Sequence, residues 1–414
     1  MKHIYTSVDI GSDTIKIVVC ELFKNKLSLL AASSIKSDGI KKGLITNVDK
    51  ALESLKKAIN EVEQMLGVKI TKAIASVPSY MANFTMIKGK IDLSLGHGET
   101  IQGNEVVQVL QNASKNKMMS NEEMITIIPI DFMVDENIVR DPKGMTGLKL
   151  SARAVMVTTP RKNVYSVASL LNNLGIEVVD IALGGIGDIY AFKRKKMDEQ
   201  IGAIVNIGHE ITNISLYNKG VIVKNSIIQY GGKNIENDIS YIYKVSDEDS
   251  IKLKENFALA HKNSASVNDF YEVNTLYGEK IKVNQFEISE VVMSRVEEIL
   301  ELSKREILSL SRRDVDYVII TGGTSNLSDF QQISREVFGN ISSVGNMKIV
   351  GVRNNKYSSA LGNIVYFINK LKLQGKNYTM MDKEDVEDLS SPKRNIGVTN
   401  ESMLSKVFGY FFEW

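Results

Sequence analysis

The feature that most constrains how this chain can fold is a weak internal duplication, whose two copies lie half a chain apart. Residues 9–14 read Asp-Ile-Gly-Ser-Asp-Thr, and residues 206–212 read Asn-Ile-Gly-His-Glu-Ile-Thr. Each copy ends an apolar strand, turns through polar residues and starts another strand, and a second turn, at 24–26 or 218–220, leads into a third. The repeat predicts two similar halves facing each other across a cleft, where two hairpins can direct backbone N–H groups at the same phosphates. Chance similarity of short motifs is the alternative, and the second copy counts against it.

Composition narrows the class of protein. At 414 residues the chain exceeds one ordinary core, which predicts roughly two to four domains. With 43% hydrophobic and 24% charged residues, most of the chain is expected to fold. Its 51 basic and 49 acidic side chains give a net charge of +2. Such a balance provides no overall basic field to hold a nucleic-acid backbone, so nucleic acid is not expected as a main partner.

Cysteine and histidine usage favours a cytosolic protein without a structural metal. Cys20 is the only cysteine, and the four histidines lack the spacing of zinc ligands. Because Cys20 lies in an alternating strand, we expect an inert buried thiol rather than a nucleophile. The N-terminus shows no apolar signal region, and no stretch approaches the roughly 18 apolar residues of a spanning helix.

Hydrophobic periodicity divides the first half of the chain into two kinds of region. Between about residues 80 and 158, short strands and a polar helix predict a small inserted domain. The glycine-rich run at 184–187 lacks dinucleotide-fingerprint spacing and is expected to mark the crossover between the halves. Outside the insertion, strands are expected at 3–9, 14–22, 27–33, 70–77 and 176–181, and helices at 48–66 and 161–174.

The second half alternates strands and helices in the same way. Helices are expected at 233–243, 247–257, 286–310 and 357–371. An apolar strand at 317–321 runs into Gly322, Gly323 and Thr324. Two glycines at the end of a strand let the base or sugar of a ligand approach the backbone closely, although a plain strand-to-helix turn is the alternative.

The C-terminal region combines a polar stretch with an aromatic end. Residues 374–400 are polar and predict a flexible linker, whereas 401–414 are abruptly aromatic. At about 100° per residue the apolar side chains of this end share one helical face, which is expected to enter a membrane interface. Docking on the protein's own core or in a partner's groove is the alternative. The proposed membrane-binding residues are Met403, Leu404, Val407, Phe408, Phe411, Phe412 and Trp414.

A family resemblance is carried most specifically by the inserted region. Residues 127–135 read Ile-Ile-Pro-Ile-Asp-Phe-Met-Val-Asp, and residues 140–150 read Arg-Asp-Pro-Lys-Gly-Met-Thr-Gly-Leu-Lys-Leu. Together they resemble a signature of the FtsA family, actin-like proteins that anchor the bacterial division ring to the membrane. Generic actin-fold kinases and heat-shock ATPases lack this signature, and the resemblance extends over nearly the whole chain.

The resemblance implies the α/β superfold of actin, sugar kinases and heat-shock ATPases. This fold has two similar lobes around a nucleotide cleft, here with a small α+β inserted domain and a C-terminal amphipathic helix. The expected divisions are 1–79 and 159–197 for the first lobe, 80–158 for the inserted domain, 198–371 for the second lobe with its partner-binding subdomain, 372–400 for the flexible linker and 401–414 for the membrane-targeting helix.

The resemblance also implies ATP with Mg²⁺ in the cleft. Glycine permits close backbone approach, hydroxyls can bond phosphate, and Asp9 can orient Mg²⁺ through water, with no direct ligation of the metal by protein expected. The second loop departs from the family pattern, because Asn206 replaces a carboxylate and His209 and Glu210 replace glycines. Glu210 would repel a γ-phosphate, so binding is favoured over turnover. The residues matching the first loop are Asp9, Gly11, Ser12, Asp13, Thr14 and Lys16, and those of the second are Asn206, Gly208 and Thr212.

The remaining nucleotide-binding residues come from three other segments. Glu236 stands where the family has threonine, and Ile251 where it has a glutamate. His209 is expected either to touch phosphate or, more frequently for such a histidine, to sit exposed in its turn. The residues implied by the resemblance are Gly231, Gly232, Lys254, Gly322, Gly323 and Thr324.

The implied function is that of a cell-division adaptor with at most weak ATPase activity. Such a protein tethers filaments of the tubulin-like FtsZ to the inner face of the cytoplasmic membrane at the division site, assembles into actin-like filaments and contacts other division proteins. The C-terminal peptide of FtsZ is expected on the lobe with helix 286–310, around Arg295. Two alternatives share the superfold, namely an ATP-dependent kinase and a pilus-assembly relative of FtsA.

Overall fold

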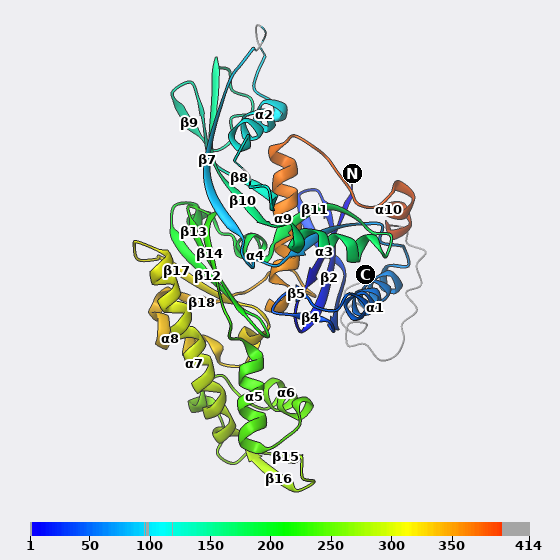
Figure 1. Ribbon diagram of the computed structural model, residues 1–414, viewed down its shortest axis with the longest axis vertical. Coiled ribbons are helices and arrows are strands. Elements are labelled where there is room, and N and C mark those ends of the chain that lie inside the picture. Colours follow the sequence, from blue (N-terminus) through cyan, green and yellow to red (C-terminus); the bar gives the residue numbers. More distant parts are fainter. Residues whose placement is uncertain (1, 95, 97–98, 118, 391–414) are drawn as a thin grey trace, which may run out of the picture.

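Two five-stranded sheets of the same topology form the centre of the molecule (Figure 1). The computed structural model describes residues 2–390 except 95, 97, 98 and 118. In each sheet an antiparallel meander of three strands is extended by two parallel strands, so the predicted duplication is confirmed. The first sheet, in the order β11-β6-β1-β2-β3, contains β1 (His3–Ile10), β2 (Thr14–Phe23), β3 (Lys26–Lys36), β6 (Lys72–Val77) and β11 (Glu177–Leu183). The second, in the order β14-β13-β12-β17-β18, contains β12 (Ile201–Ile207), β13 (Thr212–Asn218), β14 (Val221–Ile228), β17 (Tyr317–Thr321) and β18 (Ser342–Val344).

Helix α1 (Val48–Leu66) packs against the first sheet and has the predicted bounds. The Asn47 side chain accepts a hydrogen bond from the Lys50 N–H at its start, and Gly67 ends it in the left-handed conformation with φ 66°. Helix α3 (Arg161–Asn172) lies beside α1 and the same sheet. Cys20 on β2 is fully buried, and this burial raises the pKa of its thiol to about 12, which confirms the prediction of an inert thiol.

A separate four-stranded sheet extends from the end of the first lobe, at the top of Figure 1. Its strands are β7 (Asn83–Asp92), β8 (Glu122–Val134), β9 (Asn137–Val139) and β10 (Lys149–Pro160), and α2 (Gly103–Ser114) covers one face. Val106 and Val109 of α2 bury their side chains against Phe132 and Leu150. This region therefore has a small hydrophobic core of its own.

The second sheet is extended at the other end of the molecule by helices and a hairpin (Figure 1). The longest helix, α7, begins where the Asn284 side chain accepts hydrogen bonds from the N–H groups of Phe286 and Glu287. The elements are α5 (Gly232–Tyr243), α6 (Asp247–Asn256), β15 (Phe270–Asn274), β16 (Lys280–Asn284), α7 (Gln285–Leu310) and α8 (Phe330–Phe338).

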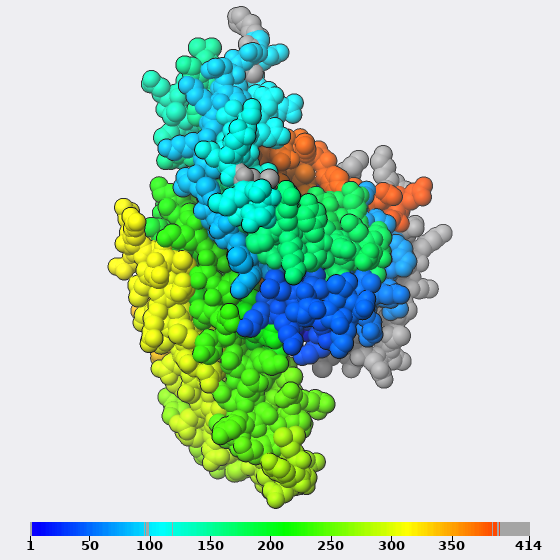
Figure 2. All heavy atoms as spheres, in the orientation of Figure 1, coloured from blue at the N-terminus to red at the C-terminus, as the bar shows by residue number. Residues whose placement is uncertain are grey.

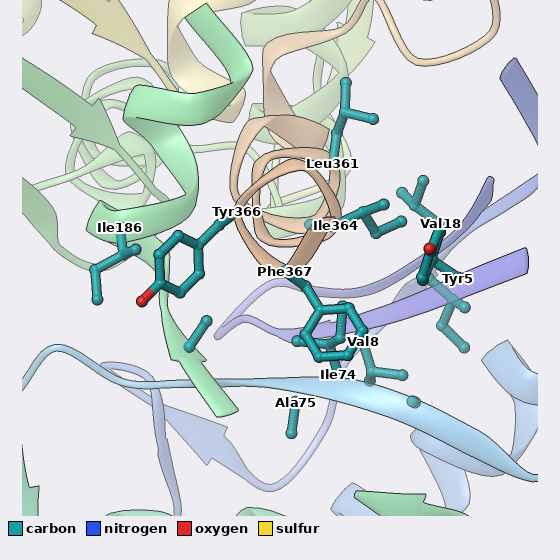
Figure 3. Packing of buried hydrophobic residues seen from close by; sticks show 14 of the residues in the cluster. Tyr5, Val8, Val18, Ile74, Ala75, Ile186, Leu361, Ile364, Tyr366 and Phe367 are labelled. Carbon is teal, nitrogen blue, oxygen red and sulfur yellow. The ribbon is translucent and has the colours of Figure 1, made fainter. Parts of the chain in front are cut away.

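Two helices cross between the lobes at a pair of glycines. Helix α4 (Gly184–Phe192) follows β11, and α9 (Ser358–Leu373) packs across it. A Cβ atom on Gly362 would lie 1.8 Å from the carbonyl oxygen of Gly187, so only glycine allows this approach. Figure 3 shows the continuation of α9, where Ile364 and Phe367 pack among side chains of the first sheet. The run at 184–187 thus serves helix packing at the crossover.

The chain after α9 does not behave as the predicted flexible linker over its described part. Thr379 Oγ1 accepts a hydrogen bond from the Ile4 N–H at 3.0 Å, and the Met380 N–H donates to the Ile4 carbonyl at 2.9 Å. Met380 and Met381 are buried, and α10 (Lys383–Ser390) follows. The physical reason is that β6 pairs with β1 only from Ser7 to Asp9, which leaves the earlier backbone groups of β1 in need of partners. The proposed membrane face and the rest of 391–414 lie outside the described residues.

Candidate functional site

A polar cleft of about 590 Å³ lies between the two sheets, and both predicted hairpins line it. The structure brings together thirteen of the fifteen predicted nucleotide-binding residues in its walls. They are Asp9, Gly11, Ser12, Asp13, Thr14, Lys16, Asn206, Gly208, Gly232, Lys254, Gly322, Gly323 and Thr324.

The two hairpins have the same backbone geometry. The Gly11 N–H donates to the Thr14 carbonyl at 3.1 Å, and the Gly208 N–H donates to the Ile211 carbonyl at 3.0 Å. Each hydrogen bond closes a four-residue turn between the first two strands of its sheet. The duplication therefore extends to single hydrogen bonds on the two facing walls of the cleft.

The first hairpin carries charged side chains. Lys16 Nζ lies 3.2 Å from Asp9 Oδ2 and also donates to the Thr14 carbonyl at 3.2 Å. Asp13 forms an ion pair with Lys36 of β3. Burial by itself would raise the pKa of Asp13, but the hydrogen bond and charge of Lys36 lower it below its usual value, so the carboxylate stays ionised.

The second hairpin is neutral at the matching place, and a carboxylate lies behind it. Asn206 Nδ2 donates to Asp188 Oδ2 at 2.8 Å and to Ser359 Oγ at 3.3 Å. Asp188 on α4 is fully buried, and Ser358 and Ser359 donate to its Oδ1 at 2.7 and 2.9 Å. Burial raises the pKa of Asp188 to about 6. Sequence reasoning missed this residue, although a lone aspartate in the apolar run 183–192 was the available signal.

His209 and Lys254 meet at a buried glutamate. Lys254 Nζ forms an ion pair with Glu236 Oε1, and His209 Nε2 lies 3.0 Å from Glu236 Oε2. The side chain of His209 is only 16% exposed, so the expectation of an exposed turn histidine is wrong. Burial alone would raise the pKa of Glu236, but His209 and Lys254 together lower it. The residue that replaces threonine therefore supplies the counter-charge for Lys254.

Glu210 connects the second hairpin to the opposite lobe. A turn joins the short strands β4 (Ile40–Lys41) and β5 (Leu44–Ile45) of the first lobe, and its Lys42 N–H donates to Glu210 Oε2. Lys42 Nζ donates to Gln229 on the second lobe, and the next N–H, of Gly43, donates to Ser12 Oγ at 2.8 Å. This turn thus contacts both hairpins.

Two of the predicted residues support the second hairpin from behind instead of lining the cleft. Thr212 is fully buried, and its hydroxyl donates to the Tyr230 carbonyl at 2.8 Å. A Cβ atom on Gly231 would lie 2.5 Å from the His209 carbonyl oxygen, so the hairpin rests on this glycine. Gly322 has φ 92°, and a Cβ there would lie 2.4 Å from the Ile207 carbonyl oxygen, which explains the glycine after β17.

Two matched lobes around a polar cleft place the protein in the actin-like class of α/β folds. Solved structures agree on this fold. A chain of a PilM–PilN type IV pilus biogenesis complex superimposes with a TM-score of 0.58 at 13% identity, covering 86% of this chain and 96% of that one. MreB5 of Spiroplasma citri bound to ADP gives 0.55 at 12% identity, covering 90% and 98%.

Sequence comparisons identify the family within this class. The model described as cell division protein FtsA matches residues 203–362, and the model described as the SHS2 domain inserted in FtsA matches 83–158. The cell division protein FtsA of Bacillus subtilis is 27% identical over 94% of this chain and 89% of its own length. That of Streptococcus pneumoniae is 27% identical over 86% and 78%. The chain belongs to the FtsA family of cell-division proteins.

Proposed function

We propose that the cleft binds ATP, with Mg²⁺ near Asp9. The observation that carries this proposal is the convergence of two matched hairpins, one from each sheet, on the same polar cavity. Lys16 adds a cation beside the first turn, and Gly322 and Gly323 leave the opposite wall without side chains. Bound ATP would supply the phosphate charge that the backbone N–H groups and Lys16 are arranged to receive.

The donor set fits a metal held chiefly by the nucleotide. Within the described ranges no group of three or more His, Cys, Asp or Glu side chains is placed to hold a metal ion. Mg²⁺ commonly keeps several waters and takes phosphate oxygens with one or two carboxylates. Asp9 is the carboxylate of the first hairpin that would orient such a water, and this requires it to exchange part of its contact with Lys16.

Hydrolysis of ATP is proposed to be slow or absent. The second hairpin presents the Asn206 amide where a carboxylate would help position a hydrated metal, and Asp188 lies behind that amide. Glu210, the carboxylate of this turn, accepts a hydrogen bond from the Lys42 N–H and so is engaged in the contact between the lobes. Phosphate release on the order of 1–100 per second, as in kinases, would contradict this part of the proposal.

As a member of its family, the protein is proposed to tether FtsZ to the membrane and to assemble into filaments. We propose that a short peptide docks at the far end of the lobe carrying α7, which lies at the bottom of Figure 2. The Leu276 N–H bonds the Lys244 carbonyl at 2.7 Å and so brings the β15–β16 turn to the end of α5. Exposed apolar side chains on these segments include Tyr241, Ile242, Leu276 and Tyr277, at 75%, 52%, 66% and 79%.

Arg295 is proposed to shape this lobe and not to bind the peptide directly. Its Nε and Nη2 atoms bond Asp238 Oδ2 and Oδ1 at 2.6 and 3.0 Å, which joins α7 to α5 in a bidentate ion pair. A bidentate partner of this kind leaves little of the guanidinium for an incoming acidic peptide.

Attachment to lipid is proposed to come from residues 401–414. None of the helices over the described residues is long and apolar enough to cross a bilayer. Support for the proposal comes from the aromatic face in the sequence, and the described chain ends in α10 on the outer flank of the first lobe (Figure 1).

One experiment tests the tether as a whole. Flotation with liposomes and FtsZ, with and without ATP, should bring FtsZ to the lipid fraction only when the full chain is present. Phe408→Glu with Phe411→Glu should release both proteins, whereas Lys406→Ala should matter little because the attraction is mainly hydrophobic. FtsZ that floats equally well with the double glutamate variant would contradict the proposal.

A further inference from the structure

We propose that Lys356, which no part of the sequence reasoning singled out, is a second phosphate-binding cation that reaches the nucleotide from the wall opposite Lys16. This inference rests on the proposed binding of ATP in the cleft and identifies which residue of the second wall recognises its charge. The ligand class is a nucleoside polyphosphate.

The backbone around Lys356 is fixed. Lys356 lies in the 3-10 turn η5 (Asn355–Tyr357), just before α9, and its N–H donates to the Asn354 side chain at 3.0 Å. The neighbouring Asn355 is buried, and its N–H and Nδ2 bond Asn326 Oδ1 and Ser325 Oγ at 3.0 and 3.1 Å. These contacts attach the turn to the segment after Gly322, so Lys356 is carried on the wall that Gly322 and Gly323 form.

The side chain of Lys356 lines the cleft without a carboxylate partner. Lys16 is paired with Asp9, and Lys254 with Glu236, whereas the ion pairs of the described residues include none to Lys356. The charges of Glu255 and Asp13 act on Lys356 and favour its charged form, but each carboxylate has another lysine as its ion-pair partner, Lys254 at 3.7 Å for Glu255 and Lys36 for Asp13. The Nζ atom instead lies 5.2 Å from the centre of the Tyr357 ring.

The electrostatics of Lys356 indicate a site that needs an anion. Its pKa is lowered, first by burial and second by the charge of Lys16. Burying an ammonium costs free energy, and so does placing it near a second ammonium. A multiply charged anion between the two lysines offsets both the loss of hydration and the repulsion. Phosphate oxygens meet this need because they accept charge-assisted hydrogen bonds from both lysines at once.

Calorimetric titration of the full chain with ATP, ADP and adenosine tests the inference. Lys356→Gln removes the charge and nearly keeps the length, Lys356→Arg keeps the charge, and Lys348→Gln makes the same change at an exposed lysine outside the cleft. We expect Lys356→Gln to weaken the binding of ATP and of ADP by roughly ten- to a hundredfold, which corresponds to the free energy of a hydrogen bond to a charged group. Adenosine affinity should be unchanged, Lys356→Arg should recover most of the loss, and Lys348→Gln should resemble the wild type.

Each outcome separates the inference from the proposal on which it rests. If the wild-type chain binds none of the ligands, ATP binding in the cleft is wrong and the inference falls with it. If the wild type binds ATP and Lys356→Gln binds it equally well, only the inference is overturned. An equal loss for ATP and adenosine would overturn it too, because such a loss indicates a structural effect on the turn.

Discussion

The two hairpins share a backbone and differ in charge. Asp9 faces Lys16 across β1 and β2 as an ion pair, whereas Asn206 faces Asn213 at the matching positions of β12 and β13. Asp13 binds a lysine of its own sheet, while Glu210, in the same place of the second turn, binds the turn of the opposite lobe. The repeat therefore provides two matched turns, whereas an ion pair at the base of the hairpin occurs only in the first of them.

The largest loss of stability is expected from breaking the buried ion pair between Lys254 and Glu236. Lys254→Met leaves Glu236 buried beside His209 alone, so the free energy of unfolding should fall by about 3 kcal/mol, the lower end of the cost of breaking a buried pair. Urea unfolding followed by circular dichroism measures this. Adding Glu236→Met should restore most of the stability, and a double variant as unstable as the single one would show that the pair is not the cause.

Lys16 of the first half should affect ligand binding instead. Lys16 lines the cleft beside Asp9, so Lys16→Gln should weaken the binding of ATP by roughly ten- to a hundredfold. Asp9, whose side chain is 17% exposed, should cost less stability when it loses its partner than Glu236, at 9%. Calorimetry with Lys26→Gln, an exposed lysine of β3, as control measures the difference. Equal effects of Lys16→Gln and Lys254→Gln on ATP affinity would remove the contrast between the two halves.

A pH-dependent change in stability is expected from Asp188, the carboxylate behind Asn206. Burial raises the pKa of Asp188 from 3.8 to about 6, so its contribution to stability is fully present below the unfolded value and is lost as pH rises through about 6. A rise of this size corresponds to roughly 3 kcal/mol. Asp188→Asn should therefore flatten the fall in stability between about pH 4 and pH 6.

Denaturation at a series of pH values measures that slope, and the difference between the two proteins isolates Asp188 from other titrating groups. Asn206→Asp should make stability fall more steeply with pH, because it places a second carboxylate beside that of Asp188 and the two repel each other when ionised. Identical slopes for the wild type and Asp188→Asn would contradict this description of the site.

The smallest effect is expected at the contact between the lobes. Glu210→Gln weakens the acceptor for the Lys42 N–H without removing it, so ATP should dissociate only a few-fold faster from a less firmly closed cleft. Stopped-flow displacement of a fluorescent ATP analogue measures the rate. Glu199→Gln, an exposed glutamate elsewhere on the second lobe, serves as the matched control.

Local pattern predicted the repeated parts of the structure and failed for contacts between distant segments. The meanders and α1 follow from alternation, helical spacing and caps, all of which lie within a few residues of one another. Asp188 comes to lie behind Asn206, and Lys356 enters the wall of the cleft, through packing between segments that are distant in the sequence. The contact of α4 with α9 is one example, and no short sequence pattern predicts it. The stretch after α9 looked like a linker because it is polar on average, yet Met380 and Met381 pack into the first lobe.

Both hairpins are proposed to bind one nucleotide from opposite walls of the cleft, and hydrogen–deuterium exchange with and without Mg²⁺ and ATP tests this most directly. If both turns contact the bound nucleotide, exchange should slow in the turn at 11–14 and in the turn at 208–211 at the same ATP concentration. Protection of only one turn, or of neither while ATP binds, would contradict it.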